Sequence, residues 1–581
     1  MTEIFEPVGE HDRRLVAGAT GLLGDLNRAG VLSAADVHVA TRTGDLAGES
    51  REEVLLAAAL AVRAVRNGSV GVDLATIRDI EPDLPWPDAA GWADAVASSA
   101  LTRAGVLHHE LGLVYLDRYH RLEQQIADDV RTRTQQSPPV VDEPALAAAL
   151  DGVREAHFSA EQEAAAVAAC RQWTTVITGG PGTGKTTTVA RMLALLSSQS
   201  DRPLSIALSA PTGKAAARLA EAVGDEMPAE FVDRVGRPDA MTLHRLLGWR
   251  PDNTTRFRHD RGNRLKYDVI VVDECSMVDL TMMARLLEAV RPQTRLVLVG
   301  DPRQLTSVGA GAVLSDLVEA LPDALVRGLS ANYRSAADIQ TVADALRDAE
   351  DADAVLEALR SGSDQVEFVE TDDPAAILRA SLVEQAVAVR RRAFAGDAEG
   401  AIEALGRHRL LCAHREGPRG VRLWNRQVEQ WLGEETGDPI YGAWYVGRPL
   451  LVTANDHALE IYNGETGVAV LADGRLRARI DGARHGLTDL APGRLDAVDT
   501  MHALTIHKSQ GSQAEAVTVL LPEEGSRLLT RELFYTAVTR AQDRLRVVGS
   551  EAAVRAAVAT RAQRATGLRQ RLRQRLDHRQ D

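Results

Sequence analysis

The sequence predicts an α/β protein with two parallel-sheet domains, a small β insertion and a mostly helical N-terminal domain. Three observations lead to this fold class. From residue 174 onwards, apolar runs without polar alternation, typical of buried parallel strands, recur between helical segments. These runs form two sets, separated by a Gly-rich stretch at about 440–500. Residues 1–130 instead show Ala-rich helical patterns interrupted by Gly and Pro.

The N-terminal domain is expected at 1–130, with helical apolar stretches such as 54–65 and 113–127. A polar segment at 131–146 follows, and its Pro138-Pro139 pair favours an extended linker. No catalytic motif occurs in the N-terminal domain, so we look for chemistry after the linker.

The first α/β domain is expected at 147–328, and the second at 329–437 together with 500–555. The β insertion occupies 438–499, and a basic tail, either a helix or a disordered segment, follows at 556–581. The expected strands of the first domain are 174–178, 204–210, 268–274 and 295–301. Those of the second domain are 365–370, 409–413, 516–521 and 545–549.

Composition excludes several classes of protein. The net charge of −15 over 581 residues excludes a protein that coats nucleic acid by bulk charge. The three cysteines lie far apart, so neither a zinc site, a four-cysteine iron–sulfur cluster nor a disulfide framework is expected. No apolar run approaches the ~18 residues of a membrane span, and the first residues lack the apolar region of a signal peptide. We therefore expect a reduced, cytoplasmic protein with no membrane partner.

A phosphate-binding loop follows the first expected strand. The sequence GGPGTGKT fits the pattern G-x-x-x-x-G-K-[ST] between a strand and a helix, a context that disfavours a glycine-rich turn without function. Backbone N–H groups of such a loop point at phosphate oxygens, and Lys185 is expected to reach the β- and γ-phosphates. The predicted nucleotide-binding residues of the loop are Gly179, Gly180, Pro181, Gly182, Thr183, Gly184, Lys185, Thr186 and Thr187.

A pair of acidic residues follows another expected strand. Asp273 supplies a carboxylate that, with the Thr186 hydroxyl, suits Mg²⁺ bound to a triphosphate. Glu274 can then polarise the attacking water. Acid pairs after apolar strands are common, but together with the phosphate-binding loop this pair predicts nucleoside triphosphate hydrolysis, with Mg²⁺ as the metal.

Further motifs occur in the order found in superfamily 1 helicases. They are FSAEQEAAA (158–166), LSAPTGKAAARL (208–219), TLHRLLG (242–248), GDPRQLTSVGAGAV (300–313), NYRS (332–335), TIHKSQGS (505–512) and LFYTAVTRAQDRL (533–545). The chain resembles this superfamily over about 155–550, and the APTGKAA and TIHKSQG forms resemble its 1B branch. As a whole, the chain most resembles the RecD family, the alpha subunits of exonuclease V (RecBCD).

The resemblance implies two RecA-like domains that use ATP and Mg²⁺ to move 5′→3′ along single-stranded DNA. It implies a helicase that acts on DNA ends in double-strand break repair by homologous recombination, in a heterotrimer with RecB- and RecC-like subunits. The N-terminal domain would dock on the RecC-like partner; a generic helical domain is the alternative. Any nuclease site of such a complex would lie on another subunit, because no suitable cluster of carboxylates is visible in this sequence.

The resemblance also assigns roles to residues outside the phosphate-binding loop. Gln162 would read adenine, and Gln304 would link the state of the nucleotide to the grip on DNA. Arg334 and Arg540, from the second domain, would neutralise charge in the transition state, although structural salt bridges are the alternative. The residues matching DNA-contacting positions are Thr212, Lys214, Thr242, His244, Thr505, His507 and Lys508. Satisfied core side chains or plain surface charges are the alternatives for these.

A basic segment at about 249–267 lies between two of the motifs, with a turn expected at Arg261-Gly262-Asn263. It resembles the β-hairpin wedge of RecD-type helicases; a solvated surface hairpin is the alternative. Two other functions remain open for the whole chain. One is a stand-alone superfamily 1B helicase acting on DNA or RNA, and the other is a P-loop ATPase switch subunit that separates no strands.

Overall fold

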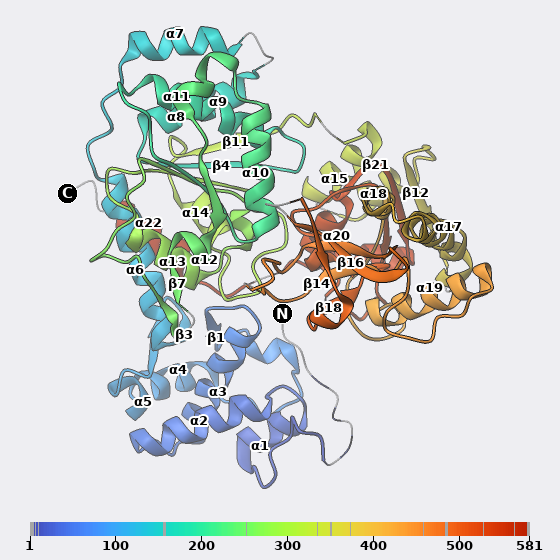
Figure 1. The fold of residues 1–581 in the computed structure, drawn as a ribbon. Coiled ribbons are helices and arrows are strands. Elements are labelled where there is room, and N and C mark those ends of the chain that lie inside the picture. The colour runs from blue at the N-terminus through green and yellow to red at the C-terminus, as the bar shows by residue number, and fades with distance from the viewer. Residues whose placement is uncertain are drawn as a thin grey trace.

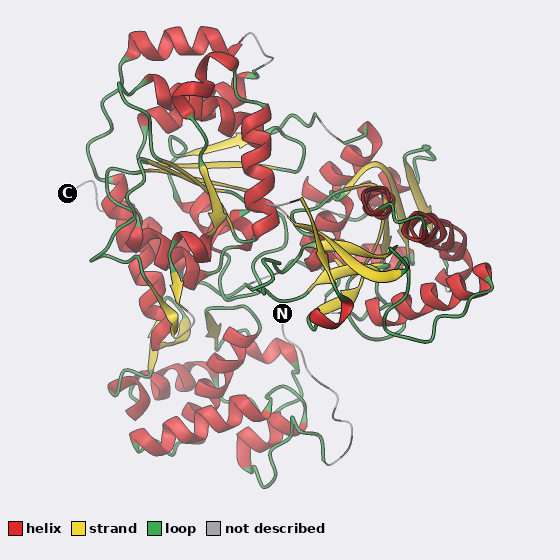
Figure 2. Ribbon diagram, in the orientation of Figure 1, coloured by secondary structure: helices red, strands yellow, loops and turns green. Residues whose placement is uncertain are grey.

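In the computed structural model the chain forms a helical N-terminal domain, two α/β domains and a small antiparallel sheet (Figure 1). The structure describes residues 5, 7, 9 and 11–577, apart from 155–157, 251–252, 334, 349–350, 372, 457, 483–485, 527 and 563. Figure 2 shows helices on both sides of the sheet of the first α/β domain, with the second α/β domain beside it. The predicted fold class is confirmed.

The N-terminal domain packs helices against a short antiparallel sheet of order β1-β3-β2. Trp92 is buried in its core, and the indole Nε1 donates to the Glu53 carbonyl at 2.6 Å. The elements are α1 (Gly21–Arg28), α2 (Ala34–Ala47), α3 (Glu52–Arg66), β1 (Gly71–Asp73), α4 (Ala89–Ala97), α5 (Ala100–Arg103), β2 (Leu107–Glu110), β3 (Leu113–Leu116) and α6 (Asp117–Thr134).

The helical prediction for Leu113–Leu116 is wrong, because these residues form strand β3. Leu111 and Gly112, both with positive φ, turn the chain so that β3 pairs with β2. The expected linker is also shorter than predicted, because α6 continues to Thr134 and α7 begins at Glu143. The end of α6 is held by Arg133, whose guanidinium donates to backbone carbonyls of the first α/β domain.

The first α/β domain is built on a parallel sheet of order β11-β4-β10-β9-β5-β6. Its central strands are the expected apolar runs, and Val269–Val272 is buried throughout. The edge strands β6 and β11 carry polar residues and were not expected. The elements are α7 (Glu143–Arg154), α8 (Ala160–Arg171), β4 (Thr174–Gly179), α9 (Lys185–Ser198), β5 (Ile206–Ala210), α10 (Gly213–Asp225), α11 (Val232–Val235), β6 (Asp239–Thr242), α12 (Leu243–Leu246), β7 (Trp249–Arg250), β8 (Asn253–Phe257), β9 (Val269–Val272), α13 (Leu280–Ala289), β10 (Arg295–Gly300), α14 (Val313–Ala320) and β11 (Val326–Leu329).

The second α/β domain has a parallel sheet of order β12-β21-β20-β13-β19. Its elements are α15 (Ala337–Asp348), α16 (Asp353–Leu359), β12 (Val366–Val369), α17 (Pro374–Phe394), α18 (Ala398–Arg407), β13 (His408–Cys412), α19 (Val421–Thr436), β19 (Ala503–Thr505), β20 (Ala514–Leu520), α20 (Arg531–Val538), β21 (Ala541–Val548) and α21 (Glu551–Ala559). The inserted antiparallel sheet, of order β17-β16-β15-β14-β18, consists of β14 (Pro449–Val452), β15 (Thr466–Ala472), β16 (Arg475–Gly482), β17 (Gly486–Leu490) and β18 (Val498–Thr500).

The C-terminal segment leaves the second α/β domain and packs on the N-terminal domain and the first α/β domain. Helix α22 (Leu568–Asp577) packs on α6 and α14, and the side chains of Leu568 and Leu572 are fully buried there. The segment is therefore helical over much of its length. In the described part of the chain, no helix combines the length and the apolar character needed to cross a lipid bilayer.

Candidate active site and nucleic-acid interface

The phosphate-binding loop lies between β4, which ends at Gly179, and α9, which begins at Lys185. Gly182 and Gly184 have φ of 85° and 75°, values that glycine adopts without strain. The Lys185 ammonium donates to the carbonyls of Gly179 and Gly180, both at 2.8 Å. The lysine and the first amides of α9 thus gather hydrogen-bond donors at one strand end, as phosphate binding requires.

Asp273 and Glu274 follow β9, at the same edge of the parallel sheet as the loop. Burial and the charge of Glu274 raise the pKa of Asp273 to about 6, whereas the charge of Lys185 lowers it. Glu274 has a φ of 52°, which is uncommon outside glycine and typical of constrained functional sites. Glu274 and Lys185 therefore both lie close enough to the Asp273 carboxyl to act on it. The Asp273 carboxylate and the Thr186 hydroxyl are oxygen donors of the kind that Mg²⁺ prefers.

Gln304 connects the two α/β domains. Its Nε2 donates to Asp301 Oδ2 at 3.1 Å, and its Oε1 accepts from Arg540 Nη2 at 3.1 Å. Burial lowers the pKa of Arg540, and the nearby Glu274 carboxylate is the largest influence in the opposite direction. The arginine of the second domain is therefore placed between the glutamine and the acid pair of the first.

Tyr535 makes a further contact between the domains, which the sequence analysis missed. Its hydroxyl donates to Asp301 Oδ2 at 3.1 Å, and a Cβ placed on Gly180 would lie 3.0 Å from that hydroxyl. The next residue, Thr536, accepts the backbone N–H of Leu305 at 2.9 Å. Both side chains belong to the motif that contains Arg540, so their position in that motif is the signal that could have identified them.

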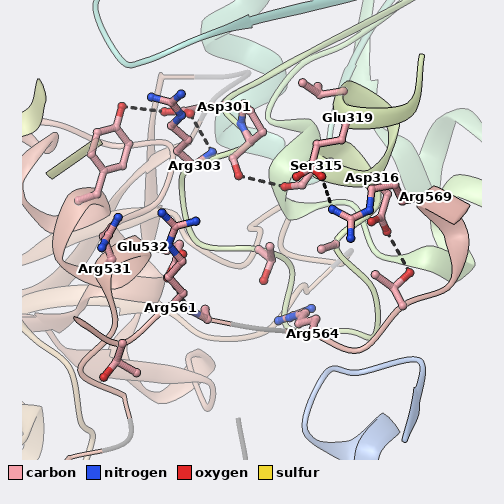
Figure 3. Close-up of a pocket in the computed structure, with 18 of the residues that line it drawn as sticks. Asp301, Arg303, Ser315, Asp316, Glu319, Arg531, Glu532, Arg561, Arg564 and Arg569 are labelled. Atoms are coloured by element: carbon pink, nitrogen blue, oxygen red, sulfur yellow. Dashed lines mark hydrogen bonds and ion pairs between the residues drawn. The ribbon is translucent and has the colours of Figure 1, made fainter. Parts of the chain in front are cut away.

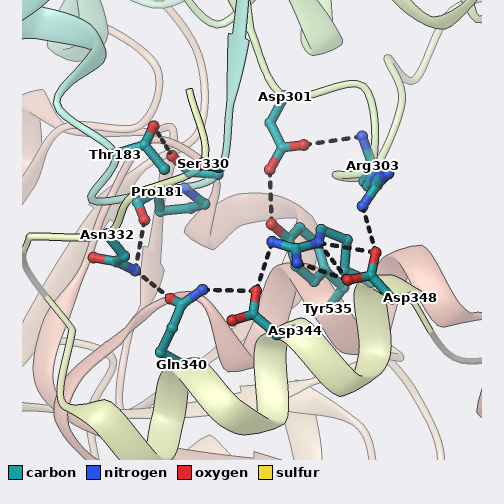
Figure 4. A network of polar contacts seen from close by, with 12 residues as sticks. Pro181, Thr183, Asp301, Arg303, Ser330, Asn332, Gln340, Asp344, Asp348 and Tyr535 are labelled. Atoms are coloured by element: carbon teal, nitrogen blue, oxygen red, sulfur yellow. Dashed lines mark hydrogen bonds and ion pairs between the residues drawn. The ribbon is translucent and has the colours of Figure 1, made fainter. Parts of the chain in front are cut away.

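A chain of polar contacts runs from the phosphate-binding loop along α15 (Figure 4). Asn332 donates to the carbonyl of Pro181 at 3.2 Å and to the side chain of Gln340. From Gln340 the contacts continue to Arg303, through Asp344, Arg347 and Asp348. Arg334 lies outside the described residues. Its neighbour Tyr333 donates its backbone N–H to the Gly182 carbonyl at 2.9 Å, so this motif lies against the loop.

Gln162 is buried at the start of α8. Its Oε1 accepts the backbone N–H of Ser159 at 3.1 Å, which closes a capping box. A Cβ placed on Gly184 would lie 2.3 Å from Gln162 Nε2. The amide is therefore beside the phosphate-binding loop, with its oxygen engaged in the cap, and adenine recognition by this residue stays a prediction.

A cleft of about 1960 Å³ extends from the phosphate-binding loop to α14 and α22. Residues of the N-terminal domain, including Leu113 and Val72, line its far end. Figure 3 shows the polar wall of this cleft, in which the labelled cations are Arg303, Arg531, Arg561, Arg564 and Arg569. The cleft thus joins the candidate ATP site to a junction of all three domains.

Three of the proposed DNA contacts occupy equivalent positions. Thr242 and Thr505 are the last residues of the parallel strands β6 and β19, and Thr212 lies two residues after β5. Each hydroxyl accepts a backbone N–H, at 3.2–3.3 Å, and caps the helical turn that follows. Because the hydroxyl is an acceptor in the cap, its own hydrogen can still donate to a phosphate oxygen.

The other proposed DNA contacts are two imidazoles and two ammonium groups. Burial lowers the pKa of His244 and of His507, which favours neutral rings. Burial and the charges of Arg218 and Arg409 lower the pKa of Lys214 to about 8. Lys508 pairs with Asp499 at 3.3 Å. DNA binding by these residues stays a prediction.

The basic hairpin is shorter than expected. Strand β7 pairs antiparallel with β8, so the paired residues lie within 249–257. The turn predicted at Arg261-Gly262-Asn263 is present, because the Asn263 N–H donates to the Asp260 carbonyl at 3.2 Å, but it lies outside the paired strands and does not connect them. The Asp260 carboxylate also accepts the N–H groups of Gly262 and Asn263, and Arg261 pairs with Asp129 of α6 at 2.7 Å.

Two RecA-like domains with a phosphate-binding loop in one, and polar contacts from the other reaching it, define an ATP-dependent helicase motor. Family models match an AAA domain at 162–310, a UvrD-like helicase C-terminal domain at 500–548, and the N-terminal domain of RecBCD enzyme subunit RecD at 28–146. RecBCD enzyme subunit RecD of Mycobacterium tuberculosis is 56% identical over 570 residues, 95% of this chain and 97% of that one. The chain belongs to the RecD family.

Two more relatives extend the comparison. RecBCD enzyme subunit RecD of Mycolicibacterium smegmatis is 56% identical over 94% of this chain and 98% of its own length. The ATP-dependent RecD2 DNA helicase of Deinococcus radiodurans is 33% identical over 80% of this chain and 59% of its own length. The identities extend beyond the motor into the N-terminal domain for the two mycobacterial relatives, which cover nearly the full chain.

Proposed function

We propose that this chain is the RecD subunit of a heterotrimer with RecB- and RecC-like subunits, and that it moves 5′→3′ along single-stranded DNA at double-strand breaks. The bridge from Asp301 through Gln304 to Arg540 carries the motor part of this proposal, because it ties the ATP site of one domain to the other. The 56% identity to RecD proteins over 95% of the chain supports the partners.

The residues of the site divide the work of ATP hydrolysis. Lys185 neutralises the β- and γ-phosphates, Glu274 orients the attacking water, and Arg540 stabilises the charge that develops in the transition state. Mg²⁺, when bound with ATP, would be held by Asp273 and Thr186 and would neutralise phosphate charge. Closure on ATP and opening after hydrolysis would then move Gln304 and alternate the grip on DNA.

The first test is ATPase activity of the full chain with and without single-stranded DNA. Wild type is expected to be stimulated by oligothymidylate, and Lys185→Gln is expected to be inactive with and without it. Arg42→Gln, which also removes a cation but at an exposed position of the N-terminal domain, is the control and is expected to behave as wild type. An ATPase rate that single-stranded DNA does not stimulate, or that is unchanged in Lys185→Gln, would refute the proposed motor function.

Partners and polarity need separate tests. Tagged chain, co-expressed with RecB- and RecC-like subunits, is expected to purify as a three-subunit complex. The complex carrying an inactive RecB-like ATPase should displace a duplex with a 5′ tail and not one with a 3′ tail. The reverse preference would contradict the proposed direction, and stimulation by RNA instead of DNA would contradict the proposed substrate.

A further inference from the structure

A C-terminal strap, defined by residues 560–562 and 564–567, connects the second α/β domain to the rest of the molecule. At its start, the Thr560 carbonyl accepts the N–H of Arg531 at 2.9 Å, and the N–H of Ala562 donates to Glu532 at 2.8 Å. At its end, the N–H of Gly567 donates to Glu123 of α6 at 2.9 Å. The strap therefore leaves the second α/β domain and is fastened to the N-terminal domain.

Arg564, in the middle of the strap, holds a loop of the first α/β domain. Its Nη1 donates to the carbonyls of Gly309 and Gly311 at 2.6 and 3.0 Å, and its Nη2 donates to the carbonyl of Ser307. We call these contacts the Arg564 clamp. Burial lowers the pKa of Arg564 only to about 10, so the guanidinium stays charged near neutral pH and its donors stay strong. Figure 3 shows Arg564 on the wall of the cleft.

The clamped loop begins directly after the bridge between the α/β domains. Gln304 contacts Arg540, and the adjacent Leu305 is fixed by Thr536 through its N–H and by Gln510 through its carbonyl. The tip of the loop, Val308, is 87% exposed, so burial of the tip does not hold the loop in place. Its shape depends on polar contacts, of which the Arg564 clamp provides those at Ser307, Gly309 and Gly311.

The N-terminal domain completes the clamp from the other side. The Gly68 carbonyl accepts the N–H of Gly311 at 2.9 Å, and the N–H of Val70 donates to the Ala565 carbonyl at 2.8 Å. Gly68 has a φ of 85°, and a Cβ placed there would lie 2.9 Å from Arg564 Cζ. Only glycine fits this position without moving the guanidinium.

We propose that Arg564 is a positioning residue for ATP-driven movement. It holds the loop 307–311, so that a displacement of Gln304 relative to Arg540 is transmitted to the far end of that loop. The N-terminal domain takes part through Gly68. A loop held at 305 by the second domain and at 307–311 by the strap can transmit a displacement from one end to the other, whereas an untied loop would absorb it. The segment that carries the predicted DNA contact His507 lies beside this loop, because Gln510 Nε2 donates to the Leu305 carbonyl at 2.9 Å, and burial, together with the charge of Arg564, lowers the pKa of His507.

The inference rests on the proposed function, and its test compares two rates in the full chain. For Arg564→Ala, we expect the basal ATPase rate and the KM for ATP to stay within about twofold of wild type. We expect the kcat stimulated by oligothymidylate to fall about tenfold, the scale of a typical coupling between sites. Arg561→Ala removes an exposed arginine of the same strap and is expected to keep both rates.

A pair of glycine variants tests the clamp from the N-terminal domain. Gly68→Ala forces a Cβ against Arg564 and is expected to reproduce the loss of stimulation. Gly48→Ala has a similar φ strain, at 70°, but its Cβ would meet nothing within 4 Å, and we expect normal stimulation. The loss in Arg564→Ala/Gly68→Ala should be smaller than the product of the single losses, because both changes break the same contact.

These outcomes separate the inference from the proposed function. Wild type that DNA does not stimulate would overturn the motor itself. Stimulated wild type with full stimulation in Arg564→Ala would overturn only the clamp. Equal loss of the basal and the stimulated rates would also overturn it, because a merely structural role lowers both. If Arg564→Ala does not fold, the difference between Gly68→Ala and Gly48→Ala decides.

Discussion

Two buried polar interfaces hold this molecule together, and they are built differently. The motor interface joins the α/β domains through Asp301, Gln304, Tyr535 and Arg540. The C-terminal junction joins α22 and the strap to α6 and α14 through Glu123, Asp316, Thr566 and Arg571. In the motor interface a neutral amide stands between the carboxylate and the guanidinium. In the C-terminal junction the charged groups meet directly.

The C-terminal junction is crowded with carboxyl groups. Arg571 donates to Glu123 at 3.1 Å, and their side chains are 3% and 0% exposed. The Thr566 hydroxyl lies 2.9 Å from Glu123 Oε1 and 3.0 Å from Asp316 Oδ2. A hydroxyl has one hydrogen, so it can donate to only one of these groups, and the other must be protonated to donate in turn. Burial accordingly raises the pKa of Asp316 to about 7.

The difference indicates where the molecule can move. Opening the C-terminal junction would leave buried charges without partners, which costs several kcal/mol. Opening the motor interface separates single hydrogen bonds of a neutral amide and a hydroxyl with Asp301 and Arg540, each of which contributes about 1.5–3 kcal/mol and can be replaced by water. We therefore expect motion during the ATP cycle at the motor interface, with the C-terminal junction staying closed.

The largest expected effect is at the motor interface. Arg540→Ala should lower the stimulated kcat by about 10³-fold or more, the scale for arginines that neutralise phosphoryl-transfer charge. Steady-state ATPase rates at saturating ATP measure it. Arg544→Ala, at an exposed position on β21 four residues after Arg540, is the control and should be unaffected. A loss below about tenfold in Arg540→Ala would remove this residue from the reaction.

The next effect is on stability at the C-terminal junction. Arg571→Ala leaves Glu123 buried without its cation and should reduce the free energy of unfolding by about 3–5 kcal/mol. Urea unfolding, followed by far-UV circular dichroism, measures it. Arg573→Ala, on the exposed side of α22, should change little. Equal stability of the two variants would mean that the Arg571–Glu123 pair does not hold the helix.

The raised pKa of Asp316 predicts a dependence of stability on pH. Because the folded protein holds this proton up to about pH 7, whereas an ordinary aspartate loses it near 4, the stability it contributes is present at low pH and lost as pH rises through 7. Between pH 5 and 8, wild type should lose on the order of 3 kcal/mol more than Asp316→Asn. Urea unfolding of both proteins at the two pH values measures this difference. If wild type and Asp316→Asn lose the same free energy of unfolding between these pH values, the assignment of the raised pKa to Asp316 is contradicted.

The smallest expected effect concerns a single hydrogen bond of the motor interface, the one from Tyr535 to Asp301. Tyr535→Phe removes only the donor to Asp301, and the stimulated kcat should fall about tenfold, because a hydrogen bond to a charged group contributes about 1.5–3 kcal/mol. Tyr441→Phe, at a side chain that is 92% exposed, is the control. An unchanged rate in Tyr535→Phe would assign the coupling to Gln304 alone.

Much of the fold was predictable because it depends on neighbouring residues. Apolar runs such as Val269–Val272 identify buried strands, and a glycine-rich loop between a strand and a helix identifies the phosphate site. The predictions that failed concern segments whose local sequence pattern does not settle their structure. Leu113–Leu116 became a strand because β1 and β2 pair with it, and the edge strands β6 and β11 carry too few apolar residues to be recognised.

The sequence by itself determined which residues form the candidate site, because Lys185, Asp273 and Glu274 belong to short segments whose local pattern sets their conformation. Only the tertiary structure decided which distant groups they meet. Gln304 and Arg540 are 236 residues apart, and Arg564 is 257 residues from Ser307. Such contacts depend on how whole domains pack, and no local periodicity or spacing encodes the pairing of side chains brought together only by that packing.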